Sequence, residues 1–293
     1  MSNLVEIKKR IESITSTIKV TKVMQMIATA KIAKIKTKMS AVEKYNNYAN
    51  EIVSEYLKNI EDTAEFDKYF IKNENNKNIL FVVFSSDKGT CGSINTNIFK
   101  EINILIKQHQ DKRETITILP IGKKAVKYFE TNASKIGVNV YQIDKYADAE
   151  YCNNEIIHNT VNNLIVAYNN GRFGEIHFVY HKFKNIITCN AVDDILLPFD
   201  KSQINIEKAE FFNITKTEFI SSSIIEFFIR TKLYNAYISN IASIVSSRMN
   251  AMDNATKNGQ EIIDELKIKY NKGRQANITS ELSDIVSGFE AIS

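Results

Sequence analysis

The segment SSDKGTCGSIN, residues 85–95, carries the residues best placed for phosphate chemistry. It follows the apolar run ILFVVF and precedes an amphipathic segment, so it is expected to be a strand-to-helix turn, where enzymes often hold a phosphate. Gly89 and Gly92 are three residues apart, a spacing that fits neither the dinucleotide-binding fingerprint nor the P-loop. We therefore interpret the turn as structural and expect no bound cofactor.

Cysteine and histidine are too scattered to suggest a metal or catalytic site. Cys91, Cys152 and Cys189 lack the paired spacing of zinc ligands or of a disulfide framework. Cys91 lies near an expected helix N-terminus, but no histidine can be placed beside it from the sequence. His177 and His181 lie on an expected strand, roughly 13 Å apart. We predict core or surface histidines, no metal ligand and no catalytic residue.

The two ends of the chain are expected to form long helices, at 1–58 and about 206–293. In the first, apolar residues recur at three- and four-residue steps, as in a heptad seam. The seam fails only at Thr21 and Gln25, and its members are Leu4, Ile7, Ile11, Ile14, Ile18, Ala28, Ile32, Ile35, Met39 and Val42. The second stripe comprises Ile238, Ile241, Val245, Met252, Ala255, Ile262 and Leu266. After a phase shift near Tyr270 it continues with Ile278, Leu282, Ile285, Phe289 and Ile292.

Two such stripes predict an antiparallel coiled coil, because a folded region must lie between them. At about 1.5 Å per residue, the first helix would span about 85 Å and the second about 120 Å. The second helix should therefore extend past the first by about 40 Å. Since its end still carries apolar residues, we infer that another protein surrounds it.

The middle of the chain changes to alternating strands and helices. After a polar linker at 59–76, apolar runs at 79–84 and 115–121 predict buried strands, each followed by a helix. The sequence NVYQI near Tyr141 is a candidate third strand, and a helix at about 153–168 leads into two successive strands ending near residue 198. This pattern predicts a domain at 77–200. The fold class is therefore α/β, with a long antiparallel coiled coil of N- and C-terminal helices and a central Rossmann-like α/β domain.

Charge is concentrated at the N-terminus. Residues 1–45 hold ten Lys or Arg and three Glu, whereas the whole chain has a net charge of +4. A basic stripe favours an acidic partner, although an ordinary solvated face also explains Lys31, Lys34 and Lys38. Nucleic acid is disfavoured, because no aromatic residue before Tyr45 could stack on a base. No apolar run is long enough to span a bilayer and the N-terminus has no signal-peptide pattern, so we expect a cytosolic chain.

Three segments resemble the gamma subunit of F-type ATP synthases. They are TIKVTKVMQMIATAK at 17–31, SSDKGTCGSIN at 85–95 and RMNAMDNATKNGQEIIDELKIKYNKGRQANITSELSDIVSG at 248–288. Departures are small: Lys88 and Thr90 replace the family's usual Arg and Leu, and Gly273 stands where Ala is common. Residues 107–219 contribute only a general pattern to the resemblance.

This resemblance implies a shaft inside a ring of alternating alpha and beta subunits, with the α/β domain near epsilon and the membrane ring of c subunits. The chain would be non-catalytic and would couple proton flow to ATP synthesis or hydrolysis. The residues implied in contacts with beta are Arg274, Gln275, Thr279, Glu281, Lys19, Lys22 and Met24. Those implied on the epsilon and c-ring side are Asp87, Lys88, Gly89, Cys91 and Gly92. The implied location is peripheral, on the cytoplasmic face of the bacterial inner membrane or the matrix side of the mitochondrial inner membrane.

Two other functions remain open from the residues alone. A free-standing coiled-coil adaptor with an α/β head would have the same helical stripes. An enzyme that uses the 85–95 turn would require that turn to bind a phosphate. Association with ATP-hydrolysing subunits separates the three alternatives.

Overall fold

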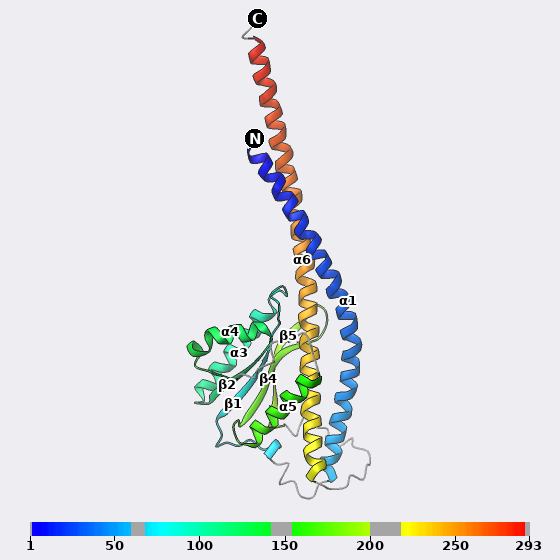
Figure 1. Ribbon diagram of the computed structural model, residues 1–293, viewed down its shortest axis with the longest axis vertical. Helices are drawn as coiled ribbons and strands as arrows, with labels where there is room; N and C mark the ends of the chain where they lie inside the picture. Colours follow the sequence, from blue (N-terminus) through cyan, green and yellow to red (C-terminus); the bar gives the residue numbers. More distant parts are fainter. Residues whose placement is uncertain (1, 60–67, 142–153, 200–217, 291–293) are drawn as a thin grey trace. The chain divides into compact units, whose positions relative to one another are not determined.

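The computed structural model describes residues 2–59, 68–141, 154–199 and 218–290. They divide into two compact units, one made of 1–29 with 248–293 and the other of 30–247. Helices α1 (Ser2–Asn59) and α6 (Glu218–Glu290) each contribute to both units (Figure 1). Both terminal helices expected from the sequence are therefore present. Residues 206–217, where the second was expected to begin, lie outside the described residues.

In the first unit, α1 and α6 form an antiparallel pair. Gln25 of α1 bonds with Asp253 of α6, and Thr21 bonds with Thr256. Residues earlier in α1 therefore contact residues later in α6, as expected of antiparallel helices. The predicted seam of α1 is confirmed, because its apolar residues from Leu4 to Ile18 are partly buried, whereas most of their neighbours are exposed.

The stripe predicted on α6 is wrong at two positions in this unit. Ala255 is exposed and Ile262 is 42% exposed, although both were assigned to the seam. The buried or partly buried positions that continue the seam are Met252, Thr256, Gly259, Ile263, Leu266, Tyr270, Gly273 and Asn277, of which Met252 and Leu266 were predicted. The error arose because polar residues and two glycines occupy true seam positions, where a search for large apolar side chains does not find them.

Gly259 and Gly273 lie in the seam because large α1 side chains occupy the space beside them. A Cβ on Gly259 would lie 2.8 Å from Ile18 Cγ1, and one on Gly273 would lie 2.9 Å from Leu4 Cδ2. The two glycines are two heptads apart, as are their partners, so the same packing repeats along the pair. From Gly273 to Glu290, α6 continues for about 25 Å beyond the Leu4 level, less than the predicted overhang.

The second unit contains a five-stranded sheet in the order β3-β2-β1-β4-β5. Its strands are β1 (Asn78–Phe84), β2 (Thr115–Ile121), β3 (Asn139–Val140), β4 (Glu175–Phe183) and β5 (Cys189–Leu197). The first four are parallel and β5 is antiparallel to β4. The central strand β1 is buried from Ile79 to Phe84, which confirms that its continuous apolar run faces packed layers on both sides.

Helices cover both faces of this sheet (Figure 1). Helices α3 (Ile94–Asp111) and α4 (Lys123–Ile136) lie on one face, while α5 (Asn154–Asn169) and α6 lie on the other. This placement follows from right-handed crossovers, because the chain moves outward from β1 to β3 and then returns to β4 on the opposite side. The predicted Rossmann-like α/β arrangement is confirmed. Its third strand is shorter than NVYQI, and residues from 142 lie outside the described residues.

Small polar residues attach α6 to the edge of β4. The Ser239 hydroxyl accepts the backbone N–H of Phe183 at 2.9 Å, and the Ser243 hydroxyl donates to the carbonyl of His181 at 3.1 Å. On the same helix, Tyr237 packs edge-on against Phe84 of β1, with ring centroids 5.1 Å apart. This part of α6 therefore belongs to the core of the second unit, unlike the exposed end of the helix.

Candidate functional site

The 85–95 turn is held by bonds within the second unit. Ser86 Oγ donates to the Lys88 carbonyl at 2.6 Å and accepts from Asn95 Nδ2 at 2.8 Å. Asn95 Oδ1 in turn accepts the Ser86 backbone N–H at 3.0 Å. Asp87 Oδ1 accepts the backbone N–H of Lys123 at the start of α4. Because these groups satisfy one another, the geometry supports the structural interpretation of the turn.

Within this turn, exposure separates the residues available to a partner from those that support the backbone. Lys88, Gly89 and Gly92 are exposed, and Asp87 is partly buried. Cys91 is fully buried, and its carbonyl accepts the Ser247 hydroxyl at 2.6 Å. Its thiol therefore cannot reach a partner directly, and Cys91 can only shape the turn that presents its neighbours.

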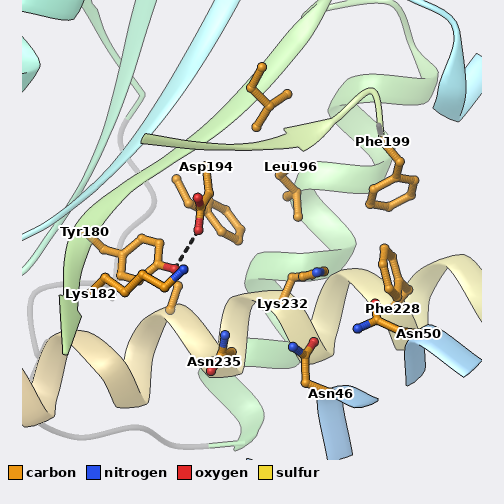
Figure 2. A pocket seen from close by; sticks show the side chains of 13 residues that line it. Asn46, Asn50, Tyr180, Lys182, Asp194, Leu196, Phe199, Phe228, Lys232 and Asn235 are labelled. Atoms are coloured by element: carbon orange, nitrogen blue, oxygen red, sulfur yellow. Dashed lines mark hydrogen bonds between the residues drawn. The ribbon is translucent and has the colours of Figure 1, made fainter. Parts of the chain in front are cut away.

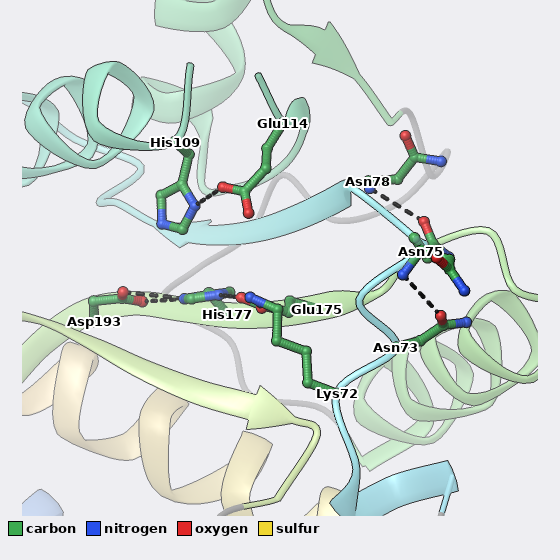
Figure 3. Close-up of polar contacts among 10 residues, drawn as sticks. Lys72, Asn73, Asn75, Asn78, His109, Glu114, Glu175, His177 and Asp193 are labelled. Atoms are coloured by element: carbon green, nitrogen blue, oxygen red, sulfur yellow. Dashed lines mark hydrogen bonds and ion pairs between the residues drawn. The ribbon is translucent and has the colours of Figure 1, made fainter. Parts of the chain in front are cut away.

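His177 belongs to a buried polar cluster that spacing alone did not reveal (Figure 3). Its Nδ1 lies 3.0 Å from Asp193 on β5, and its Nε2 lies 3.1 Å from Glu175 on β4. Lys72 pairs with Glu175, and His109 on α3 packs edge-on against the His177 ring. Asp193 on β5 is opposite Val179, two residues beyond His177 on β4, and Glu175 is two residues before His177, so the strand register supplies the signal that spacing lacked.

Electrostatics in this cluster favours a protonated His177. Burial alone would lower the pKa of His177, but its bonds to Asp193 and Glu175 outweigh burial and raise it to about 9. The bond from His177 lowers the pKa of Glu175 to about 2, with Lys72 adding to the effect against burial. His181, also on β4, is buried and its pKa is lowered to about 4 by burial. The expectation of core histidines is confirmed.

The parts of the chain that the structure describes hold neither a metal-ligand cluster nor a membrane-spanning helix. Those parts contain no group of three or more His, Cys, Asp or Glu residues arranged to hold a metal ion. None of their helices has a stretch apolar and long enough to cross a bilayer.

The residues expected to contact a beta subunit lie in the first unit. On α6, Arg274, Gln275, Thr279 and Glu281 are all exposed. Four large apolar side chains on this end of α6 are also exposed, namely Ile278, Leu282, Ile285 and Val286. Exposing this much apolar surface to water is unfavourable, so this end of α6 is a candidate interface with another protein.

On α1, the candidate contacts Lys19, Lys22 and Met24 are exposed as well. The structure adds an apolar stripe that the sequence analysis missed. Val20, Val23 and Ile27 are each at least half exposed and follow the same three-four spacing on a face other than the seam. A second hydrophobic stripe on a basic helix was the signal that could have identified this surface.

An antiparallel helix pair with exposed apolar stripes, joined to a Rossmann-like domain, defines a shaft protein that acts through partners. A family model described as ATP synthase matches residues 3–292. The gamma chain of Clostridium kluyveri ATP synthase is 35% identical over 297 residues, covering 99% of both chains. That of Pelagibacter ubique is 33% identical over 300 residues, covering all of both. This chain belongs to the ATP synthase gamma-chain family.

Solved structures agree on the fold. A chain of the Euglena gracilis mitochondrial ATP synthase superposes with a TM-score of 0.68 at 16% identity, covering 99% of this chain and 95% of that one. A chain of the Tetrahymena thermophila central stalk and c-ring gives a TM-score of 0.53 at 22% identity, covering 80% of this chain and 99% of that one. At these identities the likeness is one of architecture.

Proposed function

We propose that this chain is the rotary central-stalk subunit of an F-type ATP synthase. In this role it couples proton flow through a membrane c-ring to ATP synthesis or hydrolysis in a surrounding alpha–beta ring. The observation that carries the proposal is the exposed apolar end of α6, from Ile278 to Val286, in a chain of the gamma family. Related chains have been solved in assemblies with F1 and a c-ring, and in a central stalk with its c-ring. A free-standing adaptor is not favoured.

Partner contacts are assigned by surface. The alpha and beta subunits surround the helix pair, with beta contacting Arg274, Gln275, Thr279 and Glu281 on α6 and Lys19, Lys22 and Met24 on α1. All seven are exposed, as an intermolecular contact requires. The epsilon subunit and the c-ring contact the side of the second unit that carries the 85–92 turn. Hydrogen bonds hold the backbone of this turn around Cys91, so that Asp87, Lys88, Gly89 and Gly92 are available to a partner.

The coupling mechanism follows from the unequal faces of the helix pair. Lys19 and Lys22 lie beside the apolar stripe of Val20 and Val23, whereas the seam residues face α6. A ring subunit therefore contacts a different surface at each angle of the shaft. Differential contact free energy is what shifts a population between conformations, so rotation favours each catalytic site in turn.

The chain itself is non-catalytic, and the nucleotide chemistry belongs to the ring. The 85–95 turn has neither the glycine spacing of a phosphate loop nor a lysine and hydroxyl at its end. Its Ser86 and Asn95 side chains are engaged with one another and with the backbone. A phosphate would have to displace these bonds.

Membrane association is peripheral and occurs through the complex. The location we propose is the cytoplasmic face of a bacterial inner membrane, since the gamma chains of Clostridium kluyveri and Pelagibacter ubique align with this chain over nearly their whole length. The matrix side of a mitochondrial inner membrane is the alternative.

The test is native purification of the tagged chain from its host membranes. We expect it to bring down a complex that hydrolyses ATP and contains alpha, beta, epsilon and c subunits. Ile14→Asp places a charge in the seam and should prevent assembly, while Ser13→Asp on the exposed face is the matched control. Recovery of the chain alone, or in a complex without ATP-hydrolysing subunits, would rule the proposal out.

A further inference from the structure

A cavity of about 370 Å³ lies within the second unit, between α1, the β4–β5 hairpin and α6. Figure 2 shows side chains from all three elements around it. Its volume is in the range of sites that hold small molecules. The rings of Phe178, Phe199 and Phe228 line it and are almost completely buried. The cavity therefore has an apolar wall against which the carbon skeleton of a ligand could pack.

Positive charge exceeds negative charge around this cavity. Lys232 from α6 and Lys182 from β4 line it together with Asp194 from β5. Asp194 Oδ2 accepts the Tyr180 hydroxyl at 2.6 Å. Lys232 is partly buried, and no described residue forms a hydrogen bond or an ion pair with its ammonium. Its ammonium lies over the Phe228 ring, 5.1 Å from the ring centroid.

A bound anion would stabilise the charged form of Lys232. Burial lowers the pKa of Lys232 and Lys182 lowers it further, while Asp194 opposes them. A desolvated ammonium gains most from a counter-charge that reaches it directly.

Two buried acceptors face the same space. Asn46 and Asn50 are one helical turn apart on α1 and both line the cavity. The side-chain oxygens Asn46 Oδ1 and Asn50 Oδ1 are buried, and no donor among the described residues reaches them. Native proteins rarely leave a buried polar atom unsatisfied, because nothing then compensates for the loss of its hydrogen bonds to water. Hydroxyl or amine groups of a bound molecule could donate hydrogen bonds to these two oxygens.

We propose that this cavity binds a small hydroxylated organic anion. A phosphate or carboxylate group is held by Lys232 at the interior and Lys182 at the mouth. Hydroxyl groups of the same molecule donate to Asn46 and Asn50, and its carbon atoms pack against the phenylalanine rings. Water could satisfy the asparagine oxygens, but it would add no negative charge beside Lys232 and Lys182 beyond that of Asp194.

The test uses the full-length chain and three probes in isothermal titration calorimetry. Glycerol phosphate carries both features, inorganic phosphate lacks the carbon skeleton and its alcohol groups, and glycerol lacks the anion. We expect glycerol phosphate to bind at least about tenfold more tightly than inorganic phosphate, and glycerol to give no measurable heat. No binding of glycerol phosphate, or equal binding of inorganic phosphate, overturns the proposal; equal binding would indicate an adventitious ion only.

Two variants place the binding in this cavity. Lys232→Met keeps the length of the side chain and should weaken glycerol phosphate binding by about tenfold or more, whereas Lys107→Met on the exposed side of α3 should not change it. Asn50→Asp keeps the side-chain size and introduces a negative charge into the cavity, so it should also weaken glycerol phosphate binding by about tenfold or more. It decides the question if Lys232→Met fails to fold. Unchanged affinity in a folded variant of either position overturns the proposal.

Discussion

The hydroxyl oxygens of Thr21 on α1 and Thr256 on α6 lie 2.8 Å apart, at the point where the apolar seam of α1 is interrupted. One turn further along, Gln25 Nε2 donates to Asp253 Oδ1 at 2.9 Å. These two contacts form a polar layer between the helices. A shift of either helix by one residue would separate both pairs, whereas apolar side chains tolerate sliding. We infer that the layer fixes the register of the helix pair, as single polar seam residues do in other coiled coils.

Replacing the two threonines should reveal a small coupling between them. Each hydroxyl can also donate to a carbonyl of its own helix, that of Ile18 for Thr21 and that of Met252 for Thr256. Each therefore keeps a hydrogen-bond acceptor when the other threonine is replaced. Thr21→Val and Thr256→Val should each cost at most about 1 kcal/mol, and the double variant less than their sum. Urea unfolding of the four proteins measures the cycle. Strictly additive losses would show that the hydroxyls do not interact.

The two seam glycines should respond differently to substitution. On Gly273, a methyl group would meet the end of the Leu4 side chain, which can rotate away. Because Ala favours a helix interior over Gly by about 1 kcal/mol, Gly273→Ala should be neutral or stabilising. Gly259→Val places a branched side chain against Ile18 and should destabilise the pair by about 1 to 3 kcal/mol. Thermal unfolding compares them, and a stabilising Gly259→Val would contradict the close packing at Ile18.

The cluster around His177 predicts that stability falls as the pH rises above neutrality. The pKa of His177 is raised from 6.5 to about 9, so the protonated form is favoured in the folded chain. The resulting stabilisation is fully present below pH 6.5 and is lost as the pH rises through about 9. It amounts to roughly 3 to 4 kcal/mol. We expect His177→Gln to remove most of this decline in urea titrations at increasing pH, and the half-exposed His158→Gln to retain it.

On the acidic side, Glu175 gives the opposite dependence. Its pKa is lowered from 4.5 to about 2, so its contribution is present above pH 4.5 and is lost as the pH falls through about 2. The cluster as a whole is therefore most stabilising between pH 4.5 and 6.5. A stability maximum well above pH 7 that is unchanged in His177→Gln would show that other groups control the pH dependence.

What could be predicted from the sequence depended on periodicity. The seam from Leu4 to Ile18 and the buried strand from Ile79 to Phe84 were identified because one residue type repeats at the period of one structure. The polar layer at Thr21 and the close approach at Gly259 were missed, because their meaning depends on the residue opposite. That information exists only once the register of the two helices is known.

The same limit applies to the sites. Arg274 and Lys19 were named from the family resemblance, and their exposure agrees with their positions outside the apolar seams. The pairing of His177 with Asp193 did not, since it requires the register of β4 against β5. The cavity between α1, the hairpin and α6 combines residues such as Asn46 and Lys232, and no spacing in the sequence relates them.

The isolated chain should hydrolyse no ATP. The Ser86 and Asn95 side chains are bonded within the turn, and Gly92 adopts a φ of 62° that serves the turn itself. Purified chain, free of ring subunits, should release phosphate from ATP at the rate of a buffer blank. Turnover that is abolished by Gly92→Val, with the fold retained, would assign catalysis to this turn.

Arg274 is the exposed residue on α6 whose loss should affect rotation most directly. It makes no hydrogen bond or ion pair with any described residue, so its guanidinium is available to a partner. A guanidinium can hold a carboxylate with two bonds, and Gln275 beside it offers a neutral donor and acceptor. Such a contact can be made at only one ring position at a time and must break as the shaft turns. At about 1.5 to 3 kcal/mol it would shape a rotational step without preventing it.

We therefore expect Arg274→Ala to assemble normally and to slow coupled ATP turnover by several-fold. Arg274→Glu should slow it further, because it places a negative charge against the acidic surface expected on beta. Lys272→Ala, an exposed cation on the same helix, is the matched control and should turn over at the wild-type rate. ATP hydrolysis, ATP synthesis and torque of the assembled complex are the measurements. If Arg274→Glu assembled and left all three unchanged, Arg274 would not be a contact with beta.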